Sequence, residues 1–149
     1  MMIKVQKNDF DVNQEIKNVS SENKNIGGIG LFIGKVREGN DSELKSMTLE
    51  HYPIMTEKQL EHINNEAKVR WRLIDSLIIH RYGKLYPGDQ IVLVATFSEH
   101  RADALKACEF LIDWLKTKAP FWKLEESKEG KVWVEEKKSD LKAANKWKL

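Results

Sequence analysis

The alternation of apolar and polar residues first predicts a strand, then a helix, then a second strand. Residues 2–6 alternate as in a strand, and the apolar residues of 10–19 lie near helical spacing, with Asp11 as a candidate N-cap. After a polar linker, the glycines and apolar residues from Gly28 to Val36 predict a buried strand. A strand followed by a helix therefore opens the predicted fold.

The middle of the chain predicts further strands around one helix. Residues 44–52 alternate as in a strand, and Pro53 followed by "TEKQ" at 56–59 has the spacing of a helix start with a capping box. Leu60, Ile63 and Ala67 would form the apolar face of that helix. "SLIIHRYG" predicts a strand and "KLYPGDQ" a turn. "IVLVATFS" predicts the central strand, because it is the most continuous apolar stretch.

The last third of the chain predicts a long helix and a hairpin. Between Glu99 and Lys118, apolar residues recur at intervals of three and four, namely Leu105, Cys108, Leu111, Ile112 and Leu115. Pro120 would end this helix, and "FWKLEES" and "KVWVEE" would pair around "KEG". The polar tail, 137–149, could be a frayed helix or mobile. Helices mixed with strands joined by tight turns favour an α+β fold over a doubly wound sheet.

Composition favours one domain and restricts charge effects to local sites. With 149 residues, of which 41% are hydrophobic, the chain can bury one substantial core, so 1–149 is interpreted as a single domain. A net charge of +2 gives little general attraction to nucleic acid or anionic membranes. The single cysteine, Cys108, excludes an intramolecular disulfide and fits a reducing compartment such as the cytoplasm. No apolar run approaches the roughly 18 residues of a membrane span.

Two basic pairs are candidates for anion binding. On an extended segment, Lys35 and Arg37 point to the same side and could face one ligand. The glycines of this segment miss the dinucleotide-binding spacing and fit close packing better. At the start of the long helix, His100 and Arg101 meet the positive end of the helix dipole, which costs about 0.3–1 kcal/mol unless an anion lies nearby. The alternative is a solvated arginine beside a capping Ser98.

A second candidate cluster lies in "LKTKAPFWKLE". A helix end followed by a reversal at Pro120 could bring the amines of Lys116 and Lys123 to one pocket wall, with Phe121 and Trp122 anchoring the reversal. Lysines at a helix C-terminus also favour the negative end of the dipole. That alternative explains Lys116 without a function, but it does not explain Lys123.

The histidines predict no metal site. His51 and His62 lack a Cys, Asp or His partner at ligand spacing, and neither a metal nor another cofactor is expected. His80, which with Arg81 closes an apolar strand, is interpreted as structural and left outside the site.

Five stretches in order, "FIGKVR", "LEHYPIMTEKQL", "IIHRYGKLYPGD", "SEHRADAL" and "LKTKAPFWKLE", together resemble the large, catalytic subunit of molybdopterin synthase. The resemblance runs from about Gly28 to Glu136 and is specific because five separate stretches agree. It implies an α/β hammerhead fold with an additional antiparallel β-sheet.

The resemblance also implies a reaction and partners. Such a sulfurtransferase passes sulfur to cyclic pyranopterin monophosphate and forms the dithiolene of molybdopterin during molybdenum-cofactor biosynthesis. The sulfur would come from the C-terminal Gly-Gly thiocarboxylate of a small ubiquitin-like subunit. Two large subunits would form the central homodimer of a heterotetramer. Because sulfur arrives on another protein, the chain needs no thiol nucleophile, and Cys108 lies on an expected buried helix face.

The resemblance implies Lys116 and Lys123 as catalytic residues. Lys116 would lie nearest the thiocarboxylate and the reacting carbon, and Lys123 would support acid–base chemistry and charge stabilisation. The implied substrate-binding set is Lys35, Val36, Arg37, His100, Arg101, Lys116, Lys123, Leu124 and Glu125.

Within that set the implied roles differ. The four basic residues outside the lysine pair would hold the phosphate and pterin, and Glu125 would orient Lys123 or accept from the pterin. Val36 and Leu124 would supply backbone contacts. Leu124 departs from the family, which usually has a basic residue there, and the loosely matched tail is assigned no catalytic role.

Two functions of other classes remain as alternatives. A single-stranded RNA-binding module could use lysines and arginines interleaved with Trp71, Trp122, Trp133 and Trp147, although the charge balance weakens this reading. The chain could also be a non-catalytic scaffold for a ubiquitin-like partner.

Overall fold

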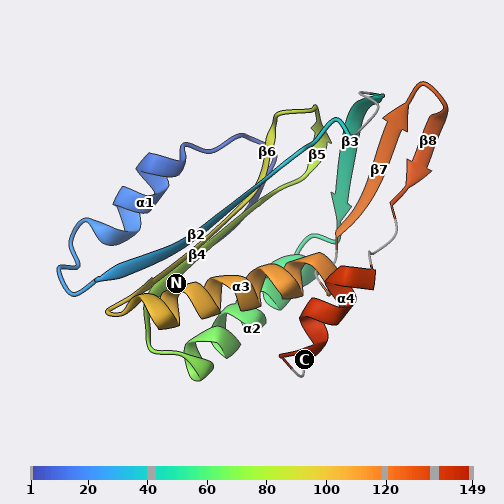
Figure 1. Cartoon of the computed structure of the whole chain (residues 1–149). Coiled ribbons are helices and arrows are strands. Elements are labelled where there is room, and N and C mark those ends of the chain that lie inside the picture. Colours follow the sequence, from blue (N-terminus) through green and yellow to red (C-terminus); the bar gives the residue numbers. More distant parts are fainter. Residues whose placement is uncertain (1, 40–42, 119–120, 135–137, 148–149) are drawn as a thin grey trace.

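The computed structural model describes residues 2–39, 43–118, 121–134 and 138–147. Its elements are β1 (Met2–Gln6), α1 (Val12–Ser20), β2 (Gly28–Lys35), β3 (Leu44–His51), α2 (Met55–Arg70), β4 (Leu73–Arg81), β5 (Gly83–Leu85), β6 (Gln90–Ser98), α3 (Arg101–Thr117), β7 (Phe121–Ser127), β8 (Gly130–Trp133) and α4 (Lys138–Asn145). The described strands form two four-stranded sheets, ordered β1-β4-β6-β2 and β5-β3-β7-β8. In Figure 1, α1 covers one face of the first sheet, α2 and α3 lie along the other face, and the second sheet stands at one end.

The predicted α+β class and the additional antiparallel sheet are confirmed. The second sheet is antiparallel throughout its described pairs, and in the first sheet only β1 and β4 pair in parallel. The predicted hairpin near the C-terminus is present as β7 and β8, with Gly130 at a φ of 114° at the turn.

The predicted central strand, β6, lies between β4 and β2 and is buried on both faces. Successive strand residues point to opposite faces. Val92 and Val94 belong to the core under α2 and α3, whereas Leu93 and Phe97 belong to the core under α1. The continuous apolar run therefore reflects helices on both sides of the sheet.

The first helix begins as predicted. Asp11 is the N-cap of α1, and its carboxylate Oδ1 accepts the backbone N–H of Gln14 at 3.1 Å. The amine of Lys4 in β1 lies 3.0 Å from the carboxylate of Glu15 in α1. Asp11 thus fixes the start of the helix, and the ion pair ties α1 to the edge strand β1.

The predicted capping box of α2 is wrong, although the apolar face of this helix is confirmed. The N-cap is Ile54, at a φ of 72° and without a side-chain capping bond. Thr56 lies inside the first turn, fully buried, and its hydroxyl donates to the carbonyl of Tyr52 at 2.7 Å. The spacing suggested a cap, but burial directs the Thr56 hydroxyl back to the preceding chain.

Two predictions of burial are wrong, one for the strand β2 and one for the helix α3. β2 is an edge strand, and Ile29 and Leu31 on it are 42% and 47% exposed. In α3, Leu105 is 58% exposed. The buried residues of α3 include Cys108 and Leu111 of the predicted face and, in addition, Ala104, Ala107, Phe110 and Trp114. Pro120, the predicted end of this helix, lies outside the described residues, and α3 ends at Thr117.

The described part of the tail packs against α3. The indole N–H of Trp147 donates to the carboxylate of Asp113 at 2.6 Å, and its ring lies edge-on to Phe110 at 5.6 Å between centroids. Ala144 of α4 is buried. The mobility of 137–149 stays a prediction, but these contacts hold 138–147 beside the C-terminal half of α3.

We expect Gly30→Ala to destabilise the fold, because an added Cβ would lie 2.4 Å from the carbonyl oxygen of Ala104 in α3. Overpacking of this kind costs about 1–3 kcal/mol of unfolding free energy, measurable by urea denaturation. Gly28→Ala is the graded control, because its nearest contact, to the Cα of Arg101, is 3.2 Å. Equal losses in the two variants would contradict this account.

Candidate functional site

A cavity of about 1080 Å³ lies where the end of the first sheet meets the second sheet, α3 and α4. β2 and β4 both pair antiparallel with β6, so the C-terminal ends of both strands lie at the same end of the sheet. α3 follows β6 and runs back along the sheet, so its C-terminus reaches that edge too (Figure 1). Side chains far apart in sequence are therefore brought together here.

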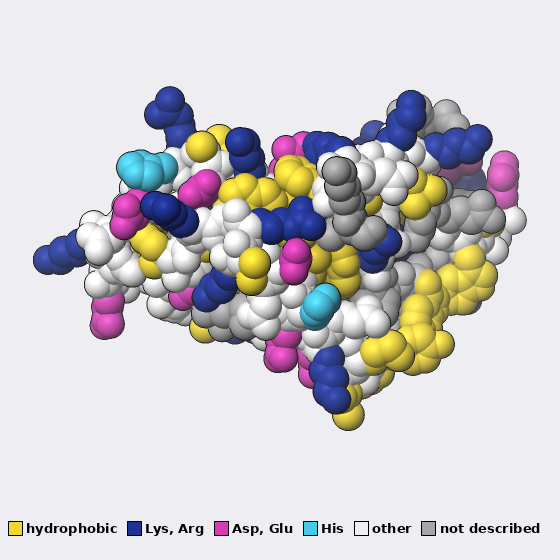
Figure 2. All heavy atoms as spheres, turned by 90° about the horizontal axis from the view of Figure 1, so that it is seen from below, with side chains coloured by type: hydrophobic (Ala, Val, Ile, Leu, Met, Phe, Trp, Pro, Cys, Tyr) yellow, Lys and Arg dark blue, Asp and Glu magenta, His cyan; other side chains and the backbone are white. Residues whose placement is uncertain are grey.

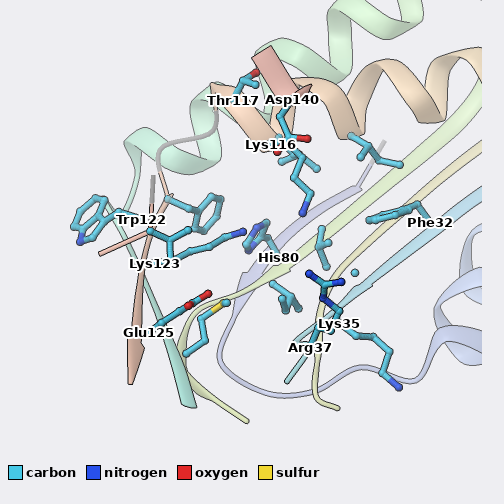
Figure 3. A pocket seen from close by; sticks show the side chains of 18 of the residues that line it. Phe32, Lys35, Arg37, His80, Lys116, Thr117, Trp122, Lys123, Glu125 and Asp140 are labelled. Carbon is cyan, nitrogen blue, oxygen red and sulfur yellow. The ribbon is translucent and has the colours of Figure 1, made fainter. Parts of the chain in front are cut away.

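Four cations line this cavity among the described residues, and they come from three separate parts of the fold. Lys35 and Arg37 lie at the exit of β2, Lys116 lies in the last turn of α3, and Lys123 lies in β7. In Figure 3 the side chains of Lys116 and Lys123 extend into the cavity from two different walls. Both predicted lysines thus face one space.

The alternation of β7 separates its residues between two faces. Lys123 and Glu125 line the cavity, whereas Leu124 does not and is paired in register with Trp133 of β8. Trp122 also lines the cavity, but its ring is directed outward in Figure 3 and lies 4.8 Å from the ring of Tyr52. A basic residue at position 124 would therefore extend from the opposite face of the sheet.

Val36 holds the two cations beside it. Its side chain is buried, its N–H donates to the carbonyl of Asp89 at 2.9 Å, and its carbonyl accepts from Gly88 at 2.7 Å. The register of β2 shifts between Gly34 and Lys35. These bonds fix the segment that presents Lys35 and Arg37, while the predicted ligand contact of Val36 stays a prediction.

His100 and Arg101 do not reach this cavity within one chain. They lie at the N-terminal end of α3, and the 15 residues from Arg101 to Lys116 correspond to about 22 Å of helix. His100, not Ser98, is the N-cap and makes no side-chain capping bond, although the hydroxyl of Ser98 accepts the backbone N–H of His100 at 3.4 Å. Both residues are exposed.

His80 is a cavity residue that the sequence interpretation left out. It is 6% exposed, its ring stacks on Phe121 at 3.7 Å and 11°, and its Nδ1 lies 2.9 Å from the carbonyl of Arg81. Burial, with the nearby charges of Lys123 and Lys116, lowers the pKa of His80 to about 3. The only sequence signal was its place at the end of an apolar strand, which is equally typical of a structural histidine.

Comparison with known proteins identifies the family. The family model described as "MoaE protein" matches residues 5–118. The molybdopterin synthase catalytic subunit of Ralstonia nicotianae is 51% identical over 97% of this chain and 83% of its own length, and that of Escherichia coli is 46% identical over 93% and 92%. A solved structure, the molybdopterin biosynthesis MoaE protein of Burkholderia ambifaria, has a TM-score of 0.85 and is 47% identical over 99% of this chain and 98% of its own.

The chain belongs to the MoaE family. The resemblance drawn from five short stretches is therefore confirmed, and so is the hammerhead fold with an added antiparallel sheet. A complex of subunits 1 and 2 of molybdopterin-converting factor from Helicobacter pylori has a TM-score of 0.76 at 22% identity, which supports the shared MoaE fold.

The single thiol of this MoaE chain, Cys108, lies in the packed core. Burial raises the pKa of the Cys108 thiol to about 12, so it stays protonated and does not act as a nucleophile.

Among the described residues, no group of three His, Cys, Asp or Glu could hold a metal ion. No described helix is long and apolar enough to cross a membrane.

The aromatic residues of the RNA-binding alternative do not form one platform. Trp71 and Trp147 pack edge-on to each other at 5.6 Å, and Trp122 packs on Tyr52. On the face in Figure 2, lysines and arginines are interspersed with acidic side chains, and hydrophobic side chains gather at one end. A stacking groove for single strands would need exposed rings along a basic track.

We expect His80 to make the stability of the fold sensitive to acid. Its pKa is about 3 in the folded protein against 6.5 ordinarily, so between these values the unfolded chain binds a proton that the folded chain excludes. The free energy of unfolding should therefore fall as pH decreases through this window. Urea denaturation at about pH 7 and about pH 4 should show a smaller decrease for His80→Phe than for the wild type. An equal decrease would contradict the assignment.

Proposed function

We propose that this chain is the catalytic subunit of a molybdopterin synthase. It transfers sulfur from the C-terminal thiocarboxylate of a ubiquitin-like small subunit to cyclic pyranopterin monophosphate and forms the molybdopterin dithiolene. The observation that carries this proposal is the cavity lined by Lys35, Arg37, Lys116 and Lys123, in a chain whose relatives are named as this enzyme. The reaction belongs to the cytoplasm, where thiols stay reduced.

The charges of the cavity suit a reaction between two anions. A phosphorylated precursor and a thiocarboxylate repel each other, and cations fixed between them reduce that repulsion. Arg37, with Lys35 beside it, is suited to hold the phosphate, because a guanidinium binds phosphate with two parallel hydrogen bonds. Lys116 and Lys123 reach in from the other walls and would lie at the thiocarboxylate and the reacting carbon.

The size of the cavity suits two occupants. Its volume, about 1080 Å³, is slightly above the roughly 300–1,000 Å³ typical of small-molecule sites. A pterin precursor alone would leave space for the extended end of a partner chain. The Helicobacter pylori complex of the two converting-factor subunits supports such a partner for this chain.

The distance to His100 and Arg101 supports a homodimer. These residues belong to the expected substrate-binding set, yet they lie at the far end of α3 from Lys116. A second copy would supply them if each protomer placed its α3 N-terminus at the cavity of the other. The edge strand β2, with exposed Ile29 and Leu31 near that end, offers a surface for this pairing.

Lys116→Ala should remove most product formation without unfolding the protein, because Lys116 is exposed and lies in the last turn of α3. Loss of a positioned cation at a charged reaction centre costs about 10²–10³ in turnover. The assay mixes purified protein, thiocarboxylated small subunit and precursor, and follows dithiolene by mass spectrometry. Lys118→Ala is the matched control, since Lys118 is exposed two residues away and does not line the cavity. Near-normal turnover in Lys116→Ala would refute the assignment.

The shared site can be tested by mixing two inactive variants. Lys116→Ala and Arg101→Ala should each be inactive alone. After mixing and reassociation, half of the dimers would be mixed, and each would keep one intact site, so about a quarter of wild-type activity should return. No recovery, despite mixed dimers seen by native mass spectrometry, would place Arg101 outside the site.

A further inference from the structure

His80 occupies the wall between the two cavity lysines. It is the next-to-last residue of β4, at the sheet edge where β2 and α3 also end. Figure 3 shows the side chains of Lys123 and Lys116 directed toward its ring from two walls. His80 therefore lies at the meeting point of the catalytic cations, although its ring is almost wholly buried.

Two contacts fix the orientation and the tautomer of this ring. Stacking on Phe121, the first residue of β7, sets the ring plane. The carbonyl of Arg81 can only accept a hydrogen bond, so Nδ1 carries the proton and donates to it. Nε2 is then unprotonated and is the hydrogen-bond acceptor of the ring.

The groups around His80 favour its neutral form. Lys123 from β7, Lys116 from α3 and His51 from β3 all oppose a positive charge on this ring, as does burial. His51 donates from Nδ1 to the hydroxyl of Thr56, since that hydroxyl already donates to Tyr52. A neutral imidazole at this place lacks the charge to repel a lysine, and it offers a lone pair.

We propose that His80 is a positioning residue whose Nε2 accepts a hydrogen bond from the ammonium group of Lys123 and so keeps that amine charged and directed at the reacting centre. A neutral acceptor favours the charged form of the lysine and leaves the positive charge of the site in place. A carboxylate would also favour the charged form, but its negative charge would cancel that of the lysine. The role in the reaction rests on the proposed function, whereas the effect on Lys123 does not.

Three variants separate the acceptor from the ring. His80→Phe keeps an aromatic ring for Phe121 but has no acceptor. His80→Gln can place an amide oxygen near the position of Nε2, whereas the shorter side chain of His80→Asn reaches only the position of Nδ1. Gln and Asn are thus a matched pair that differ in reach.

The first measurement is the reactivity of Lys123 itself, read by competitive acetylation and mass spectrometry between about pH 8 and pH 10, around the ordinary range of lysine. Without the acceptor the ammonium is less favoured, the pKa of Lys123 falls, and more neutral amine is present. Acetylation of Lys123 should rise roughly tenfold in His80→Phe and His80→Asn and stay near the wild-type rate in His80→Gln. Lys118, in the same molecules, serves as the internal reference.

The second measurement is turnover in the reconstituted complex. Turnover number should fall roughly tenfold in the Phe and Asn variants, with the precursor KM little changed, and Gln should restore it. The basic limb of the pH profile of turnover should move to lower pH in His80→Phe and His80→Asn. A purely structural histidine would move neither the limb nor the acetylation rate.

The outcomes separate this inference from the proposed function. Unchanged Lys123 acetylation in His80→Phe and His80→Asn overturns the inference, whatever the activity. If the wild-type complex forms no product, the proposed function fails, while the acetylation rates still decide the role of His80. If the Phe variant does not fold, the comparison between Gln and Asn decides by the same criterion.

Discussion

Burial of β6 on both faces is the constraint on which the rest of the structure depends. Its side chains pack alternately under α1 and under α2 and α3, so the strand must lie inside the sheet with a partner on each side. β2 and β4 pair antiparallel to β6, and α3 returns along the sheet from its end. The exits of β2 and β4 and the C-terminus of α3 therefore meet at one edge, and the second sheet closes the cavity there.

The same topology explains why the site contains charges that a single element could not supply. Lys35 and Arg37 leave the sheet at this edge, Lys116 arrives on the last turn of α3, and β7 adds Lys123. Uncharged packing lies behind two of these positions: Val36 is buried between Lys35 and Arg37, and Phe121, two residues before Lys123, stacks on His80. The packing of these buried residues therefore offsets the electrostatic repulsion among the cations, which bound anions would reduce.

Neutral groups matter as much as the cations in this arrangement. His80 lies among lysines without adding charge, because burial and the charges of Lys123 and Lys116 lower the pKa of its ring, although its hydrogen bond to the carbonyl of Arg81 acts in the opposite direction. Cys108 is buried and protonated, which fits a reaction whose sulfur comes from another protein. The tail contributes a further wall: Asp140 and Leu141 of α4 line the cavity, since Trp147 docks the tail on Asp113 and Phe110.

The sequence by itself determined the order of elements except β5, part of which was predicted as a turn, together with the central place of β6, the N-cap at Asp11 and, through five short stretches, the family. These depend on local periodicity, capping and motif identity, which neighbouring residues specify. It did not reveal that Leu105 and Ile29 are exposed, that Thr56 is no cap, or that His80 faces the cavity, because burial depends on which element covers a residue. Only the tertiary structure decided which cations share a cavity and which lie a helix length away, since chain reversal and strand pairing set those distances.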